Sequence, residues 1–167
     1  MSIGLFILTS ILLISSLVYA TPVNIETAKQ VANNWYSERN DKSSNDFKIV
    51  ESFIETENAE NIFYIFNFDK TGFVMVSADD ITIPILGYVF EHNYTSENHP
   101  PQFDAMLASF REQIVYAREN NLSASQEAQD EWERLNVRTE NFERNRDFNR
   151  LVPLLLTTWN QDFSWNT

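Results

Sequence analysis

Few residues in this sequence could do chemistry. The 167 residues include no cysteine and two histidines, so the chain has no thiol nucleophile and no Cys–His pair. His92 and His99 share one polar segment with Glu91 and Glu97, but their spacing matches no standard metal-binding pattern, and we expect them to be solvated loop histidines. The sequence also lacks a glycine-rich phosphate loop and a G-x-S-x-G motif. These side chains predict no catalytic residue, no metal site and no cofactor.

A carboxylate pair, Asp79-Asp80, is the remaining candidate for acid–base chemistry. Adjacent residues of a strand or turn point to opposite sides of the chain, which favours a turn over a shared catalytic site. Two short apolar runs, Phe73–Val76 and Ile83–Leu86, flank the pair, and Gly72 and Gly87 flank the runs. Both runs are rich in β-branched and aromatic residues, which is typical of buried strands. Glycine serves where the backbone needs positive φ or a close approach. We therefore expect the acidic pair to join two strands at the centre of a sheet.

The surrounding elements follow from the spacing of apolar residues. A helical stripe predicts a helix to about Ser37, capped by Asn24 or Thr21. Apolar runs without an intervening helix predict an antiparallel sheet, with strands at 47–55, 62–69, 73–78 and 85–90. A polar break at 56–61 separates the first two, a short loop ending in Gly72 makes a hairpin of the next two, and Pro84 stands at the start of the last.

Two further helices are expected after the sheet. One begins at Pro100-Pro101 and ends at Asn120-Asn121, and Ser123 with Gln126 forms a capping-box pattern for another that ends near Leu135. The predicted fold class is therefore α+β: an antiparallel sheet of about four strands, an N-terminal helix and two C-terminal helices.

The ends of the chain differ from this domain in composition. Residues 1–20 carry no charge and end in Val18-Tyr19-Ala20, which predicts a signal peptide cut after Ala20 and a secreted protein; an uncleaved anchor is the alternative. Residues 136–150 are charged and contain four arginines, which suits an exposed helix or linker open to proteolysis. Residues 151–167 are apolar and aromatic without helical period. The net charge of −12 argues against nucleic acid or stable membrane association and favours a basic partner surface.

One stretch carries a family resemblance. The segment Gly72–Tyr88, G-F-V-M-V-S-A-D-D-I-T-I-P-I-L-G-Y, resembles the signature of the propeptide of streptopain-family cysteine proteases and of the stand-alone streptopain (Spi) inhibitors. The tail Val152–Asn166 is similar to the start of the mature protease. The residues that carry the signature are Gly72, Phe73, Val76, Asp79, Asp80, Pro84, Leu86, Gly87 and Tyr88, with Trp159, Asn160 and Gln161 in the tail.

The resemblance implies a domain organisation and a role. Residues 21–135 would be an inhibitory pro-domain, 136–150 a processing region and 151–167 the first residues of a truncated protease domain. In the family, the nucleophilic Cys and the catalytic His follow the W-N-Q block, and this sequence ends at Thr167 before either. The chain itself is therefore not expected to be an enzyme. Its expected partner is a papain-like cysteine protease domain, in cis or in trans.

The loop His92–Pro101 is our candidate for the part that enters the protease cleft, because it is long, polar and held between ordered elements. Asn98 is the first candidate residue, with Glu97 and Asn93 beside it. An ordinary connecting loop is the alternative. Two other functions stay open: a truncated precursor fragment of a secreted cysteine peptidase, and a secreted binding module that reuses the fold.

Overall fold

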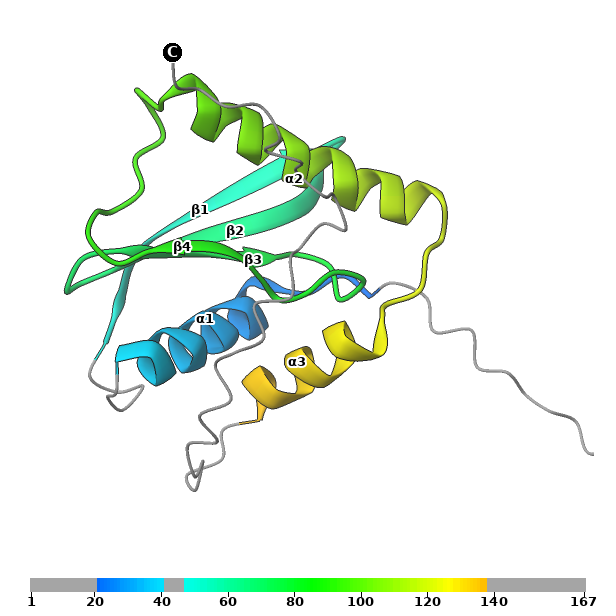
Figure 1. The fold of residues 1–167 in the computed structure, drawn as a ribbon, viewed down its shortest axis with the longest axis horizontal. Helices are drawn as coiled ribbons and strands as arrows, with labels where there is room; N and C mark the ends of the chain where they lie inside the picture. The colour runs from blue at the N-terminus through cyan, green and yellow to red at the C-terminus, as the bar shows by residue number, and fades with distance from the viewer. Residues whose placement is uncertain (1–20, 41–46, 138–167) are drawn as a thin grey trace, which may run out of the picture.

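The structure, a computed structural model, describes residues 21–40 and 47–137. Four strands form an antiparallel sheet in the order β1-β2-β3-β4 (Figure 1). In chain order the elements are α1 (Ile25–Asn40), β1 (Ile49–Glu57), β2 (Glu60–Phe68), β3 (Phe73–Ser77), β4 (Ile85–Val89), α2 (Pro101–Glu119) and α3 (Gln126–Asn136). The predicted α+β class is confirmed. The predictions for residues 1–20 and 151–167, and for the linker from residue 138 on, lie outside the described residues.

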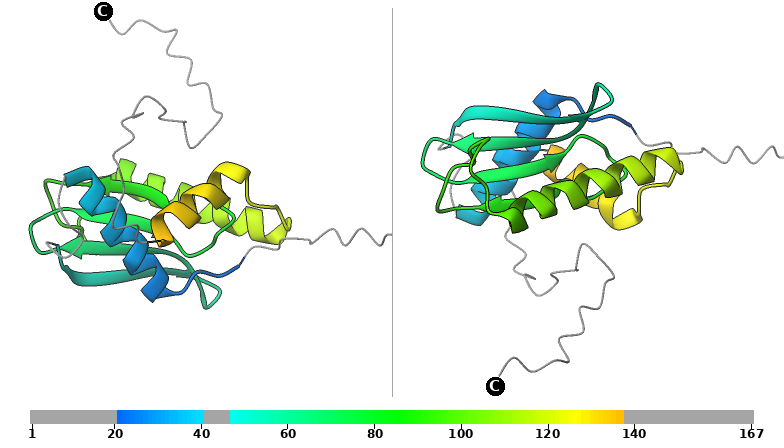
Figure 2. Two further views of the ribbon diagram at one scale, coloured as in Figure 1. Left: turned by 90° about the horizontal axis from the view of Figure 1, so that it is seen from below. Right: turned by 90° about the horizontal axis from the view of Figure 1, so that it is seen from above.

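Helices cover both faces of the sheet. Helices α1 and α3 lie side by side on one face and α2 crosses the other (Figures 1 and 2). The two central strands alternate between these layers. The α1/α3 layer buries Tyr64, Phe66, Phe68, Val74 and Val76, and the α2 layer buries Phe63, Ile65, Phe73 and Met75. Because both faces of β2 and β3 are apolar, each face needs its own helical cover.

Helix α1 starts as predicted and ends later than predicted. The Thr27 amide donates to Oδ1 of Asn24 at 2.9 Å, so Asn24 is the N-terminal cap. The helix continues three residues past Ser37, to Asn40. The last turn of this helix is polar, so the sequence shows no apolar periodicity there. That turn is held instead by Glu38, which accepts from Arg134 of α3 at 2.7 Å.

The first hairpin was missed in the sequence. Strand β1 runs on to Glu57 and β2 begins at Glu60, so the predicted polar break at 56–61 is mostly strand. A two-residue turn, Asn58-Ala59, joins them with φ of 50° and 66°. Left-handed conformations at both positions match the twist of a hairpin. The outer ends of these strands are exposed and polar, which hid them from a search for apolar runs.

The second hairpin depends on Gly72, as the sequence predicts. Gly72 has φ of +93°, and a Cβ at this position would collide with the backbone carbonyl of Val89 on β4. The Phe68 amide donates to the Gly72 carbonyl at 3.0 Å, which closes the turn. Gly87 meets the second expectation, close approach: a Cβ there would stand 2.5 Å from Cε of Met75.

Helix α3 has a different cap from the predicted one. Ser125, not Ser123, accepts the Ala128 amide on its side-chain oxygen at 3.1 Å. A start at Gln126 turns Ala128, Trp132 and Leu135 toward the core, and the indole of Trp132 donates to the Thr82 carbonyl at 2.8 Å. The contact between Trp132 and Thr82 therefore determines where the helix begins, and with it which serine is the N-terminal cap.

Replacing Gly72 by Ala should lower the free energy of unfolding by more than about 1 kcal/mol, because the left-handed φ and the Val89 carbonyl both oppose a Cβ. Urea denaturation measures the change. Ala59→Gly is the matched control: it removes a Cβ from a left-handed residue (φ 66°), so it should be neutral or slightly stabilising. Equal effects of the two substitutions would contradict the turn geometry.

Candidate functional site

The acidic pair forms a turn, and its two carboxylates serve different partners. Asp79 is buried, and its Oδ2 accepts from Nε of Arg118 at 2.6 Å while its Oδ1 accepts the Ile81 amide at 3.1 Å. Asp80 points elsewhere, and its Oδ1 accepts the Thr21 amide at 2.6 Å. The predicted turn role is confirmed, and the two carboxylates share no site.

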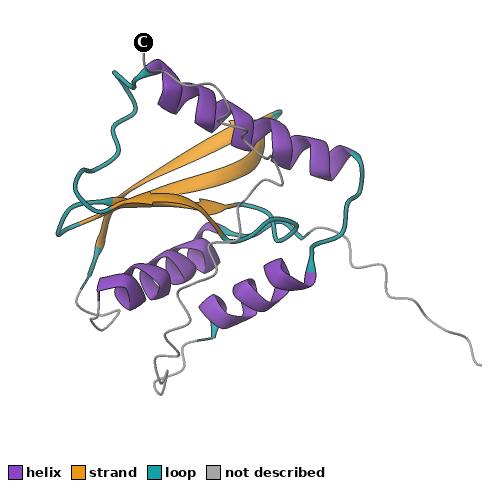
Figure 3. Cartoon of the chain, viewed as in Figure 1, coloured by secondary structure: helices purple, strands orange, loops and turns teal. Residues whose placement is uncertain are grey.

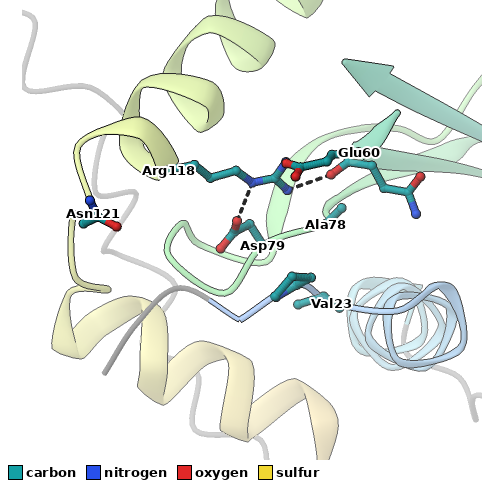
Figure 4. A pocket seen from close by; sticks show the side chains of 8 residues that line it. Val23, Glu60, Ala78, Asp79, Arg118 and Asn121 are labelled. Carbon is teal, nitrogen blue, oxygen red and sulfur yellow. Dashed lines mark hydrogen bonds and ion pairs between the residues drawn. The ribbon is translucent and has the colours of Figure 1, made fainter. Parts of the chain in front are cut away.

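A pocket of about 340 Å³ lies beside this turn (Figure 4). Its charged centre is Arg118, which comes from the end of α2. Besides Asp79, the guanidinium donates to the Asn61 carbonyl at 2.6 Å and to Glu60 at 3.3 Å. Each nitrogen of the guanidinium therefore has an acceptor within the protein. This arrangement fastens α2 to the sheet, and it occupies each of the three guanidinium nitrogens with at least one acceptor from the protein.

The loop between β4 and α2 rises along one end of the sheet to the start of α2 (Figure 3). Its first anchor is Asn67, a buried polar residue of β2. The Asn67 side chain donates to the Tyr94 carbonyl and accepts the Tyr94 amide, both at 2.8 Å. The Tyr94 ring packs against Phe53 and Phe73, with centroids 4.8 and 5.8 Å away. Burial raises the pKa of the Tyr94 phenol, and the charge of Glu55 adds to this, so the ring stays neutral.

The second anchor is His99, and here the sequence prediction was wrong. Its side chain is only 14% exposed, with Nδ1 2.9 Å from Oδ1 of Asp104 and Nε2 in contact with the Thr95 carbonyl. The imidazole centroid lies 5.0 Å from the rings of both Tyr94 and Phe103. His99 is thus a structural residue that ties the loop to the first turn of α2. His92 is exposed, as predicted.

The three candidate inhibitory residues lie on the outside of this anchored loop. Asn93, Glu97 and Asn98 are all exposed, on either side of the buried Tyr94 contact. Asn98 has φ of +63°, and the Thr95 hydroxyl donates to the Glu97 carbonyl at 3.0 Å, so the tip is a tight turn. Their entry into a protease cleft stays a prediction.

Sequence reasoning missed the residues that shape the loop. A signal for one of them was present: Asn67 is the single polar residue in the apolar run Ile62–Phe68. A buried amide needs hydrogen-bond partners, so such a residue indicates a backbone segment packed against the strand. His99 gave no comparable signal, because its packing depends on the path of the loop.

Most of the signature residues have structural roles. The two glycines and the two aspartates shape turns and close contacts, as described for each of them. Four further signature residues are buried: Phe73, Val76, Pro84 and Leu86. Tyr88 differs, because its side chain is 46% exposed on β4 and its ring lies 4.5 Å from that of Trp35. The signature residues Trp159, Asn160 and Gln161 lie outside the described residues.

Within residues 21–40 and 47–137, no group of three or more His, Cys, Asp or Glu side chains is placed to hold a metal ion. Over the same described residues, none of the helices is long and apolar enough to cross a membrane.

The described part of the chain therefore presents an anchored, exposed loop on a scaffold of one sheet between two helical layers. The family described as Spi protease inhibitor matches residues 20–114, more than half of the chain. The chain belongs to this family of protease-inhibitor and propeptide domains, which confirms the resemblance to the streptopain propeptide.

A thiol protease/hemagglutinin, PrtT of Porphyromonas gingivalis, is 28% identical over 109 residues. The match covers 63% of this chain and 13% of that relative, so the chain corresponds to a small part of a much longer protein. No solved structure matches the chain.

Arg118→Met should lower the free energy of unfolding by about 3–5 kcal/mol, because it leaves the Asp79 carboxylate buried without its cation. Arg111→Met is the control: it breaks a half-exposed pair with Glu55 and should cost about 0–1 kcal/mol. Adding Asp79→Asn to Arg118→Met should recover part of the loss, since the buried group is then neutral. Chemical denaturation at neutral pH checks all three, and no recovery in the double variant would contradict the explanation.

Asn67→Ala should release the loop. Both hydrogen bonds to the Tyr94 backbone are lost, so we expect faster amide hydrogen exchange at 94–98 and a stability loss of about 1–3 kcal/mol. Asn93→Ala changes an exposed amide of the same loop and should alter stability by less than about 0.5 kcal/mol. Unchanged exchange in Asn67→Ala would show that the loop is held by other contacts.

Proposed function

We propose that this domain blocks the active-site cleft of a streptopain-like, papain-like cysteine protease. The observation that carries the proposal is the membership of residues 20–114 in the Spi protease inhibitor family. The matched region includes α1, the whole sheet and the loop to α2. The name of the longer relative, a thiol protease, supports the same class of partner.

The loop to α2 is the proposed contact surface. An inhibitor binds better when its contact segment is already ordered, because less conformational entropy is lost on binding. Tyr94 and His99 fix the loop from inside, through Asn67 and Asp104. The exposed residues Asn93, Glu97 and Asn98 then present polar groups in set positions. In a cleft they would hold the backbone in a pose that excludes substrate and is not cleaved.

Charge supports a partner with a basic rim. The chain carries a net charge of −12, and Glu97 adds a carboxylate at the proposed contact. Opposite charge on a partner would raise the association rate, and the effect would weaken with salt. An anionic surface would be repelled.

The domain can act on a protease in cis or in trans. The cis role is supported by the length of the PrtT relative, of which this chain matches 13%. In a precursor, a tether supplies a high effective concentration, so a weak contact is enough to close the cleft. The apolar signal-like segment at residues 1–20 supports secretion of either form.

The test is inhibition of a purified streptopain-like protease by residues 21–167. The double variant Glu97→Ser, Asn98→Gly removes the carboxylate and the amide, and glycine accepts the left-handed φ of Asn98. We expect the inhibition constant to rise at least about tenfold, as for the loss of a central interface contact.

A matched control changes another exposed turn. Asn121→Gly, Ser123→Ala alters the connection between α2 and α3, where Asn121 also has a left-handed φ of 48°. It should inhibit as well as the unaltered chain. Equal inhibition by both double variants would exclude the loop as the contact while leaving the inhibitor function intact. No inhibition by the unaltered chain would overturn the proposed function in trans.

A further inference from the structure

The first described residues add a short segment beside the turn that carries the acidic pair. Pro22 forms an antiparallel bridge with Asp79, and the Val23 amide donates to the Ala78 carbonyl at 2.9 Å. The Asp80 amide donates back to the Thr21 carbonyl at 3.3 Å. On the other side, the buried hydroxyl of Tyr64 donates to the Val23 carbonyl at 2.8 Å. Backbone bonds in both directions thus fix the position of Thr21.

The side-chain carboxylate of Asp80 lies next to the backbone nitrogen of Thr21. Oδ1 of Asp80 lies 2.6 Å from this nitrogen, which is short for a neutral N–H···O bond, and charge-assisted bonds are the shorter kind. Residue 21 is also the first residue after the cut that the sequence predicts, following Val18-Tyr19-Ala20. The two observations are independent, since one comes from the leader and the other from the folded domain.

We propose that Asp80 is the receptor for the α-ammonium group of Thr21, which is created when the peptide bond between Ala20 and Thr21 is hydrolysed. Water supplies the hydroxyl that completes the new carboxylate of Ala20, and Thr21 keeps the nitrogen, which is protonated at neutral pH. Before the cut, this nitrogen donates one hydrogen bond as a neutral amide. After the cut, it is a cation with three donors in contact with a carboxylate.

The charges around the site favour a cation there. The groups that face the segment are Asp79 and Asp80 of the turn, Glu60 of β2 and Arg118 of α2. The guanidinium of Arg118 already serves Asp79 and Glu60. Of these three carboxylates, Asp79 and Glu60 pair with Arg118, whereas Asp80 contacts the nitrogen of Thr21. An ammonium group at Thr21 would neutralise the charge of Asp80, whereas the peptide nitrogen of the uncleaved chain is uncharged.

The ion pair would make the folded domain more stable after processing than before it. The sign of the pH dependence follows from the cation. If folding favours the ammonium, the extra stability is present below the pH where a free α-amine titrates, about 7.7–8.0, and is lost as pH rises through the higher value of the folded chain.

The experiment starts from the secreted chain. Intact mass should place its N-terminus at Thr21; a different terminus would overturn the proposal. The α-amine is then labelled with ¹³C-methyl groups, and its titration is followed by NMR in the chain from residue 21 and in Asp80→Asn. We expect the midpoint to fall by about half a pH unit or more in Asp80→Asn, because the carboxylate favours the charged amine.

Stability gives a second readout that does not need the variant. Acetylation of Thr21 keeps an N–H donor and removes the charge, so it should raise the unfolding equilibrium constant about two- to fivefold at pH 6 and leave it unchanged at pH 10, as for an exposed ion pair. The control Glu112→Gln removes an exposed carboxylate of α2 and should leave the amine midpoint in place. Equal midpoints in the unaltered chain and Asp80→Asn would overturn the assignment.

Discussion

The constraint on which the structure depends is the burial of β2 and β3 on both faces. A strand such as Phe63–Phe68 puts large apolar side chains alternately above and below the sheet, and burying each one contributes about 1.5–3 kcal/mol. One helical layer would leave half of them in water. The chain therefore places α1 on one face before the sheet and α2 on the other face after it, and α3 then returns to the face of α1. The long loop after β4 leads the chain into α2.

A few polar contacts fasten α2 at both of its ends. Asn67 holds the loop that leads into α2, and His99 joins the same loop to Asp104 in the first turn of the helix. At the other end, Arg118 in the last turn reaches the buried Asp79. A buried polar group is costly unless it is paired, so each of these contacts penalises any other position of the helix. The apolar layers provide the driving force, and these pairs set the register.

The sequence was most informative where local chemistry decides the conformation. The Gly72 turn, the Asn24 cap, the start of α2 at Pro101 and the turn role of Asp79-Asp80 were all predicted from residue type and spacing. Prediction failed where a distant contact decides. Ser125 is the cap of α3 because Trp132 must reach Thr82, and His99 is largely shielded from solvent because the loop folds back on Tyr94. The Asn58-Ala59 hairpin lacked a glycine or an apolar flank, so its pairing was visible only in three dimensions.

The way the loop is held bears on how an inhibitor of this kind could work. Its anchors, Asn67, Phe73 and Asp104, all belong to the described domain, so the exposed tip at 97–98 takes its shape without help from a neighbouring protease. A tether to the protease would then change only the effective concentration of a surface that is already formed. If the proposed function holds, the same loop geometry would serve in cis and in trans. The two settings would differ in the affinity that inhibition requires, and the structure of the loop would be the same. The rigid scaffold under the loop is what makes that equivalence physically reasonable, because an ordered loop loses little entropy on binding in either setting.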